Sequence, residues 1–585
     1  MANINLKING MDVSAPAGST ILEAAKLAHI DIPTLCFLKE INEIGACRIC
    51  VVEVKGARSL VASCVYPISE GMEVFTNTPR VLASRKKTLQ LILSNHDRKC
   101  LSCVRSGNCC ELQKLCKALN VDDENYYEGE KNVYEPDASA AHMVRDNNKC
   151  ILCRRCSAVC EKVQGIGVIG ANERGFKTNL SCAFEIDLAE TSCVSCGQCI
   201  AVCPTGALYE KDFTEDVLAA IAAPEKHVIV QTAPAVRAAL GEAFGLPMGT
   251  DVEGRMVAAL RRIGFDRVFD TNFAADLTIM EEATEFLNRV QNGGKLPLIT
   301  SCSPGWIKYC EHYHPDMLDN LSSCKSPQQM FGAVAKTYYA AKMGIDPKDI
   351  VMVSVMPCTA KKFEIGRDNQ NAAGVPDVDI AITTRELARL IDRAGLNFTE
   401  LPDEKFDEPL GISTGAAVIF GATGGVMEAA LRTAVWKLTG ETADSPVEFT
   451  EVRGTSGIKE ANYTVAGMEV KVAVVSGLAN ANKVLLDVKN GRADYHFIEI
   501  MGCPGGCVNG GGQPQVPASI RNFTDFKALR AKALYANDKA NKVRKSHENE
   551  GVRKLYEEFL GEPGSHKAHE ILHTTYVKRT INKEF

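Results

Sequence analysis

The spacing of its cysteines constrains this chain more than any other feature. The sequence has 585 residues, of which 24 are cysteines, and most of these stand in tight groups of the Cys-x-x-Cys kind. Disulfide frameworks are typical of short secreted chains and do not need such spacing. Several thiolates that converge on one small inorganic core do need it. The sequence therefore predicts metal or iron–sulfur ligation.

Length and composition fit several globular domains. At roughly 100–200 residues per domain the chain is a multidomain protein, and its apolar share of 45% and charged share of 24% are ordinary. No apolar run is long enough to span a membrane, and the amino terminus shows no secretory signal. The net charge is −6, and the Lys- and Arg-rich stretch 527–554 is best explained as a solvated helix face. We expect a cytoplasmic protein that binds neither membrane nor nucleic acid.

Residues 1–78 predict a small β-rich domain with four spaced cysteines. Alternating apolar residues flank Asn9-Gly10, which is typical of a β-hairpin, and ILEAAKLA (21–28) predicts a helix. The cysteines follow the spacing C-x10-C-x2-C-x13-C at Cys36, Cys47, Cys50 and Cys64. This segment resembles the plant-type ferredoxin fold, in which loop cysteines hold a [2Fe–2S] cluster.

Residues 79–125 look helical and carry a mixed ligand set. The spacing H-x3-C-x2-C-x5-C is formed by His96, Cys100, Cys103 and Cys109. This set resembles the His/Cys3 [4Fe–4S] site shared by large hydrogenases and the iron–sulfur subunit of respiratory complex I. A zinc site is the alternative for one histidine and three cysteines. We favour the iron–sulfur interpretation because the segment lies between two other cluster domains.

Residues 139–209 contain an internal repeat of the pattern C-x2-C-x2-C-x3-C. Its two copies resemble the bacterial two-cluster ferredoxin signature, in which the fourth cysteine of each run binds the other cluster. One [4Fe–4S] cluster is thus assigned to Cys150, Cys153, Cys156 and Cys203, and the other to Cys160, Cys193, Cys196 and Cys199.

The remaining chain predicts an α/β domain over 210–520 and a helical tail over 521–585. Short apolar runs such as HVIV (227–230), VMVSVM (351–356) and FIEIM (497–501) alternate with helical stretches. Ligands gather at the carboxyl ends of such strands, and Cys358 and Cys503 each follow one. The expected fold class is therefore multidomain α/β, with a β-grasp [2Fe–2S] domain and two further cluster domains ahead of the α/β domain.

Three segments of the α/β domain concentrate the remaining chemistry. They are TSCSPGW (300–306), MPCTAKKFE (356–364) and EIMGCPGGCVNGGGQP (499–514). Their thiols are sufficient for one further [4Fe–4S] cluster, and glycines near Cys503 and Cys507 let the backbone approach an inorganic group closely. The plainer alternative is four unrelated buried cysteines. The four cysteines of these segments are Cys302, Cys358, Cys503 and Cys507.

These segments resemble the three signature motifs of the [FeFe]-hydrogenases, and the resemblance covers nearly the whole chain. In that family a [4Fe–4S] cubane shares one cysteine sulfur with a two-iron subcluster that carries CO, CN⁻ and a dithiolate with a bridgehead amine. The resemblance implies an H-cluster here, with H2 and protons as substrates. It is strongest to the catalytic subunits of multi-subunit, NAD(P)-linked hydrogenases.

The resemblance also implies roles for individual side chains. Cys358 and Cys503 match cubane ligands, Cys507 matches the bridging sulfur, and Lys361 and Pro234 match residues near the cyanides. Residues that match the packing around the two-iron unit are Gln328, Met356, Phe420 and Met501.

A proton path is implied by three further residues. Glu282, Glu285 and Ser322 match its members in the family. The two carboxylates are three residues apart, which puts them on one face of a helix. A solvated acidic face is the simpler alternative.

One departure from the family concerns its usual pair of adjacent cysteines, of which the first donates protons and the second binds the cubane. This chain has Cys302 followed by Ser303. In strict register Ser303 takes the ligand position, although thiolate is the better ligand for iron–sulfur clusters. Either Ser303 binds through oxygen, or the loop shifts so that Cys302 binds and Ser303 relays protons. From the sequence alone we favour Cys302 as the ligand.

The partners follow from what the sequence lacks. The Gly-rich stretch GATGGVMEAA (421–430) lacks the spacing of a dinucleotide-binding motif, and no P-loop is present. NAD(P) is therefore expected to react on flavin-containing and [2Fe–2S] partner subunits, with ferredoxin as a further acceptor. Alternatives are a stand-alone ferredoxin-linked hydrogenase, a hydrogen sensor, and a non-catalytic subunit like that of complex I. The tail also contains His569-Glu-Ile-Leu-His573, but no third zinc ligand is evident.

Overall fold

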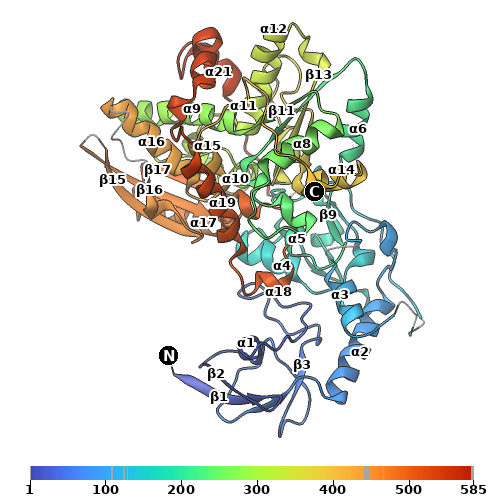
Figure 1. The fold of residues 1–585 in the computed structure, drawn as a ribbon. Coiled ribbons are helices and arrows are strands. Elements are labelled where there is room, and N and C mark those ends of the chain that lie inside the picture. Colours follow the sequence, from blue (N-terminus) through green and yellow to red (C-terminus); the bar gives the residue numbers. More distant parts are fainter. Residues whose placement is uncertain are drawn as a thin grey trace.

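The computed structural model describes residues 2–106, 110–122, 126–127, 129–440, 448–465 and 467–581. Figure 1 shows the amino-terminal domain, in blue, at one end of the molecule. The short helices α4 (Arg155–Ala158) and α5 (Gln198–Val202) lie between it and the larger carboxyl-terminal part. Within the described residues we find no helix both long and apolar enough to cross a membrane.

The amino-terminal domain is a five-stranded sheet with one helix. Its strands run in the order β2-β1-β5-β3-β4. Asn9 and Gly10 connect the first two strands with φ angles of 49° and 83°, both positive as a type I′ turn requires. The helix α1 (Ile21–Leu27) begins with a capping box between Thr20 and Glu23. The predicted hairpin and helix are confirmed. The strands are β1 (Asn3–Ile8), β2 (Met11–Pro16), β3 (Val51–Val54), β4 (Val61–Ala62) and β5 (Glu73–Phe75).

The next segment is helical, as expected, over its described part. It contains α2 (Pro79–Ser94), a 3-10 helix (Cys100–Ser102) and α3 (Glu111–Ala118). Arg85 on α2 is buried and donates to the Val51 carbonyl at 2.7 Å, which fixes α2 against the first sheet. The predicted ligand Cys109 lies outside the described residues.

The internal repeat appears as two matching turns. Each cysteine run leads into a short helix, α4 or α5, through a residue in the left-handed region. These residues are Arg154, with φ 62°, and Gly197, with φ 67°. Two small antiparallel sheets frame the turns. They pair β6 (Met143–Arg145) with β9 (Leu208–Glu210), and β7 (Gly170–Asn172) with β8 (Asn179–Ser181).

The carboxyl-terminal part contains two four-stranded sheets. The first is entirely parallel, in the order β11-β10-β13-β14. The second, in the order β12-β17-β16-β15, is parallel except for its last strand. This confirms the α/β prediction. The strands are β10 (His227–Thr232), β11 (Arg267–Asp270), β12 (Leu298–Ile299), β13 (Ile350–Met356), β14 (Ile380–Thr383), β15 (Ile458–Val465), β16 (Met468–Ser476) and β17 (Phe497–Met501).

A single long helix connects the cores of the two sheets. α9 (Asn272–Gln291) packs Phe273 and Leu277 into the cluster that contains Ile229 of the first sheet. Its Phe286 stacks on Phe497 of the second sheet, with ring centroids 5.3 Å apart. Because both ends of α9 are held by apolar burial, the polar residues along it keep fixed positions between the sheets.

The tail wraps back onto this α/β body. It contains α18 (Ala518–Arg521), α19 (Phe526–Ala540), α20 (Glu550–Leu555) and α21 (His566–Leu572). Leu555 and Leu572 are fully buried in the same core as Phe273, so the tail has no separate core, as expected. His573, from the HExxH motif, contacts Glu281 of α9 at 3.1 Å.

A buried ion triad also fixes the tail. Arg432, on α16 (Gly425–Thr439), is fully buried and bonds Asp538 of α19 through both terminal nitrogens at 3.0 Å, and Glu428 at 2.9 Å. The guanidinium offsets the cost of burying two carboxylates. α19 is therefore tied to the α/β body by charge as well as by apolar contact.

We expect Arg432→Leu to lower the free energy of unfolding by about 1.5–3 kcal/mol, because two buried carboxylates lose their hydrogen bonds to Arg432, although Arg453 still pairs with Glu428 and Arg544 with Asp538. Arg492→Leu is the control, since Arg492 is 61% exposed in its ion pair with Asp487 and such surface pairs contribute about 0–1 kcal/mol. Denaturant unfolding measures both. Equal losses in the two variants would contradict the assigned role of the triad.

Candidate functional site

The site lies where strands of both sheets end. The chain leaves β10 at Ala233, β12 at Thr300, β13 at Pro357 and β17 at Gly502. The carboxyl ends of parallel strands are where α/β folds gather their ligands. The three motif segments and Pro234 follow these strand ends, as the sequence predicted for Cys358 and Cys503.

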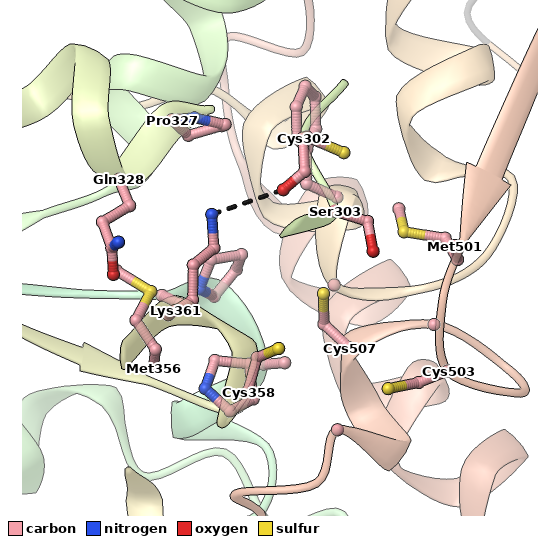
Figure 2. Close-up of a pocket in the computed structure, with 18 of the residues that line it drawn as sticks. Cys302, Ser303, Pro327, Gln328, Met356, Cys358, Lys361, Met501, Cys503 and Cys507 are labelled. Carbon is pink, nitrogen blue, oxygen red and sulfur yellow. Dashed lines mark hydrogen bonds between the residues drawn. The ribbon is translucent and has the colours of Figure 1, made fainter. Parts of the chain in front are cut away.

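These strand ends line one cavity of about 80 Å³. Its wall is mostly apolar, with a few sulfur, nitrogen and hydroxyl groups directed inward (Figure 2). Eleven of the residues singled out in the sequence line it: Pro234, Cys302, Ser303, Gln328, Met356, Cys358, Lys361, Phe420, Met501, Cys503 and Cys507. Glu282, Glu285 and Ser322 stand outside this wall.

The thiols of the cavity need a cation. Burial, and then the charge of the neighbouring Cys358, raise the pKa of Cys507 to about 12. The pKa values of Cys358 and Cys503 are also raised, first by burial. Buried thiols ionise when metal charge compensates for lost hydration. Buried thiols gathered on one wall are the donor set that an iron–sulfur core prefers.

Cys302 and Ser303 point in different directions. Ser303 precedes α10 (Pro304–Tyr313) with φ −102° and ψ 103°, and successive side chains of such extended backbone face opposite sides. Its hydroxyl lies on the side of the Cys503 and Cys507 sulfurs, whereas the Cys302 sulfur turns away from them (Figure 2). The Gly502 N–H donates to the Ser303 hydroxyl at 3.2 Å. This orientation favours Ser303 as the fourth ligand, which reverses the preference drawn from the sequence.

Lys361 is held at the opposite wall. Its ammonium donates to the Ser326 hydroxyl and to Glu364, both at 2.8 Å, and to the Cys302 carbonyl at 3.3 Å (Figure 2). Gln328 donates to the same Glu364 oxygen at 2.9 Å. The sequence analysis missed Ser326 and Glu364. The K-x-x-E spacing, which puts Lys361 and Glu364 on one helix face, is the signal that could have revealed the second.

The predicted acidic residues lie together on α9. Glu282 is fully buried, and neither of its carboxylate oxygens makes a hydrogen bond of normal geometry to another described residue. Burial, and then the charge of Glu285, raise the pKa of Glu282 to about 8. Ser322 donates to Glu285 at 2.9 Å, and Arg289 donates to Glu285 at 2.6 Å. The structure thus brings all three predicted proton-path residues together, and excludes a solvated acidic face.

The [2Fe–2S] cysteines converge within the amino-terminal domain. The Cys50 and Cys64 sulfurs are 3.3 Å apart. A hydrogen bond from the Cys36 thiol lowers the pKa of Cys47 to about 6, and one from Cys64 lowers the pKa of Cys50 to about 7. The same contacts raise the pKa values of Cys36 and Cys64, so the four thiols form two closely spaced pairs, as a two-iron cluster requires.

The ferredoxin-like cysteines lie in two groups. Cys150, Cys153, Cys156 and Cys203 line one cavity together. Electrostatic contacts join Cys160 to Cys193, and Cys199 to both. A further cavity is lined by His96, Cys100, Cys103, Cys110 and Cys116. The buried Nδ1 of His96 has no hydrogen-bond partner in the described part of the chain.

The second ferredoxin-like set lies against the cavity. Thr359, next to Cys358, donates to the Ser195 carbonyl at 2.8 Å. Gln198 donates to the Asn509 carbonyl at 2.8 Å. A Cβ on Gly511 would stand 2.3 Å from the Cys196 carbonyl oxygen, so glycine is required for this approach. Cys196 and Cys503 are close enough for the charge of one to raise the pKa of the other.

Comparisons with known families agree with this architecture. Residues 226–511 match the model of the iron-only hydrogenase large subunit, C-terminal domain, and residues 524–579 that of the iron hydrogenase small subunit. The NADP-reducing hydrogenase subunit HndD of Solidesulfovibrio fructosivorans is 52% identical over 99% of this chain and 100% of its own length. The chain belongs to the [FeFe]-hydrogenase family.

Other matches confirm this hydrogenase's domain types. Residues 1–79 match a 2Fe-2S iron-sulfur cluster binding domain, 85–125 the NADH-ubiquinone oxidoreductase-G iron-sulfur binding region, and 149–207 a 4Fe-4S dicluster domain. Iron hydrogenase 1 of Clostridium pasteurianum is 44% identical over 98% of this chain and 99% of its own. A solved variant of HydA1 from Chlamydomonas reinhardtii covers 63% of this chain and 100% of its own, at 43% identity and a TM-score of 0.56. The predicted enzyme class, iron hydrogenase, is confirmed.

We expect Glu282→Gln to weaken the pH dependence of stability. In the unfolded chain Glu282 ionises near its ordinary pKa of 4.5, but in the folded protein only near 8. The contribution of Glu282 to the free energy of unfolding is therefore fully present below pH 4.5 and is lost as pH rises towards 8. This difference is on the order of 4 kcal/mol.

Denaturant unfolding at pH 5 and at pH 8.5 tests this expectation. The wild type should lose more stability between these pH values than Glu282→Gln does, whereas the exposed Glu557→Gln should behave like the wild type. Parallel pH profiles for the wild type and Glu282→Gln would show that the buried carboxyl ionises normally.

Proposed function

We propose that this chain is the catalytic subunit of a hydrogenase that interconverts H2 with two protons and two electrons. The observation that carries the proposal is the convergence of four motif cysteines, Lys361 and Met356 on one buried, largely apolar cavity. An electron-transfer subunit would not need such a cavity. The accessory sets would hold one [2Fe–2S] and three [4Fe–4S] clusters, one of them through His96, Cys100, Cys103 and Cys109.

The cavity residues divide between two parts of an H-cluster. Cys358, Cys503, Cys507 and Ser303 would hold the cubane, with Cys507 also bridging to the two-iron unit. When bound, that unit supplies the site at which H2 is split into a proton and a hydride equivalent. Lys361 and Pro234 would contact its cyanides, and Gln328, Met356, Phe420 and Met501 exclude water from its surroundings.

Protons move along side chains of α9 and its neighbours. Cys302 lines the cavity, and burial, followed by the charge of the nearby Glu282, raises the pKa of its thiol. Glu282, with a pKa near 8, can both take and release a proton at neutral pH. Ser322 and Glu285 continue the path at 2.9 Å, and Arg289 stabilises the ionised Glu285 at the outer end.

The accessory ligand sets give electrons a route away from the cavity. The set of Cys160, Cys193, Cys196 and Cys199 adjoins Cys503, and the remaining sets lie towards the amino terminus. We propose that electrons pass to flavin-containing and [2Fe–2S] partner subunits that reduce NADP or NAD, with ferredoxin as a further acceptor. The name of the relative HndD, a subunit of an NADP-reducing hydrogenase, supports this proposal. The domains would divide at 1–78, 79–125, 139–209, 210–520 and 521–585.

We expect the isolated, fully matured chain to reduce an artificial dye with H2 but not to reduce NADP⁺. The chain supplies the cavity and the cluster ligands. It has no P-loop, and its G-x-G-x-x-G at residues 165–170 neither follows a strand nor opens a helix, as a dinucleotide site requires. Spectrophotometry of both acceptors under H2 makes the comparison, with Cys507→Ala as the inactive control. Direct NADP⁺ reduction by the chain would refute the need for partner subunits, and no dye reduction would refute the hydrogenase itself.

We expect Ser303→Cys to change the electron paramagnetic resonance (EPR) spectrum and reduction potential of the active-site cubane, because thiolate replaces an oxygen ligand. The protein should be loaded with the cubane alone, so that the readout does not depend on turnover. Ser303→Ala should lower the cubane content, while Cys302→Ala should leave it at wild-type level. Loss of the cubane in Cys302→Ala, with Ser303→Ala normal, would instead make Cys302 the ligand.

A further inference from the structure

Asn42 joins two ligand-bearing loops from different domains. It is 2% exposed, and its amide nitrogen donates to the Cys36 carbonyl at 2.8 Å and to the Cys153 carbonyl at 2.9 Å. Both distances are those of good N–H···O hydrogen bonds. One carboxamide therefore uses both of its N–H groups to bridge the amino-terminal domain and the ferredoxin-like domain.

The loop that carries Asn42 is fixed at this boundary. Asn42 and Leu38 exchange backbone hydrogen bonds at 2.8 and 3.1 Å, which closes a tight turn. Leu38 is 1% exposed and packs in the core of the ferredoxin-like domain with Met143 and Cys156. The turn belongs to the amino-terminal domain but packs into the core of the ferredoxin-like domain. The Asn42 amide therefore has one well-defined position.

The two acceptor carbonyls belong to residues assigned as ligands of different clusters. Cys36 is in the set for the [2Fe–2S] cluster, and Cys153 is in the set for a [4Fe–4S] cluster with Cys150, Cys156 and Cys203. Electron tunnelling decays more slowly through covalent and hydrogen bonds than across van der Waals gaps. The route from the Cys36 sulfur through its carbonyl, the Asn42 amide and the Cys153 carbonyl to the Cys153 sulfur is continuous in such bonds.

Other hydrogen bonds hold the same loop without touching a ligand residue. Lys162 of the ferredoxin-like domain donates to the Ile41 carbonyl at 2.9 Å, and the Lys39 N–H donates to the Asn522 side chain of the tail at 3.1 Å. These contacts hold the loop against its neighbours in the same way that Asn42 does. They therefore provide a matched comparison that separates docking of the domains from contact between the ligands.

We propose that Asn42 is a positioning residue for electron transfer, whose amide provides the contact between the [2Fe–2S] site and the adjoining [4Fe–4S] site. One electron leaves the reduced [4Fe–4S] site and one enters the oxidised [2Fe–2S] site. H2 oxidation supplies the electron, and no proton moves and no bond to iron breaks. The inference rests on the proposed cluster assignment, and it makes Asn42 a determinant of how fast electrons reach the amino-terminal domain.

The test is rapid mixing of the oxidised, fully matured chain with H2, followed by freeze-quench EPR. Asn42→Leu keeps the size of the side chain but removes both donors. The [2Fe–2S] signal should appear more slowly than in the wild type, because a van der Waals gap then replaces the two hydrogen bonds of the route. The [4Fe–4S] signals should appear at the wild-type rate. Lys162→Ala, which removes the hydrogen bond to the Ile41 carbonyl, should leave both rates unchanged.

Two measurements keep the outcomes distinct. Equilibrium redox titration should give similar [2Fe–2S] potentials for Asn42→Leu and wild type, so that slower reduction reports coupling rather than driving force. If Asn42→Leu does not load the cluster, Asn42→Ser, which can donate to one carbonyl at a time, should show the slower reduction. Unchanged rates, or equal slowing in Lys162→Ala, would overturn the proposal. A wild type without any [2Fe–2S] signal would instead overturn the cluster assignment on which it rests.

Discussion

The close backbone contact at Gly510 and Gly511 is the constraint on which the site depends. A Cβ on Gly510 would stand 2.1 Å from the Pro357 carbonyl oxygen, and one on Gly511 would stand 2.3 Å from that of Cys196. No other residue type fits at such separations. This contact joins three loops that carry ligands: the loop after β17, the loop after β13, and the second ferredoxin-like run. Replacing either glycine would push apart the groups that share the cavity.

The electrostatics of the site follow from this close packing. Buried thiols with raised pKa values lie at one end of the cavity, and Lys361 is held at its wall by Glu364 and Ser326. The low polarity that makes these thiols reluctant to ionise also raises the pKa of Glu282 to about 8. The same burial therefore prepares the cavity for a cationic core and prepares α9 to carry protons.

Much of this could be predicted from the sequence, because cysteine spacing is a local signal. The two ferredoxin-like sets, the Asn9-Gly10 hairpin and the strands before Cys358 and Cys503 all follow from residues close together in the chain. The Glu282–Glu285 pair also follows, since helical spacing puts both on one face. These features need no knowledge of tertiary structure.

The rest could not be predicted, because it depends on contacts between distant segments. Cys302 looked the better ligand by chemistry, but the extended backbone before α10 turns its side chain away from Cys503. Asn42 is an unremarkable loop residue until the fold brings Cys153 to it from 111 positions away. The contact of Arg432 with Asp538 joins positions 106 apart, and no local pattern indicates it. Local patterns identify ligands, whereas tertiary contacts decide which way they face.

Infrared spectroscopy of the matured chain tests the central claim most directly. The cavity formed by Cys507, Lys361, Met356 and Pro234 is proposed to hold a two-iron unit with CO and CN⁻ ligands, whose stretching bands lie in a window free of protein absorption. We predict these bands in the wild type and their loss in Cys507→Ala with the accessory clusters retained. A matured wild type with all accessory clusters but no CO or CN⁻ bands would contradict the account and leave the chain an electron carrier.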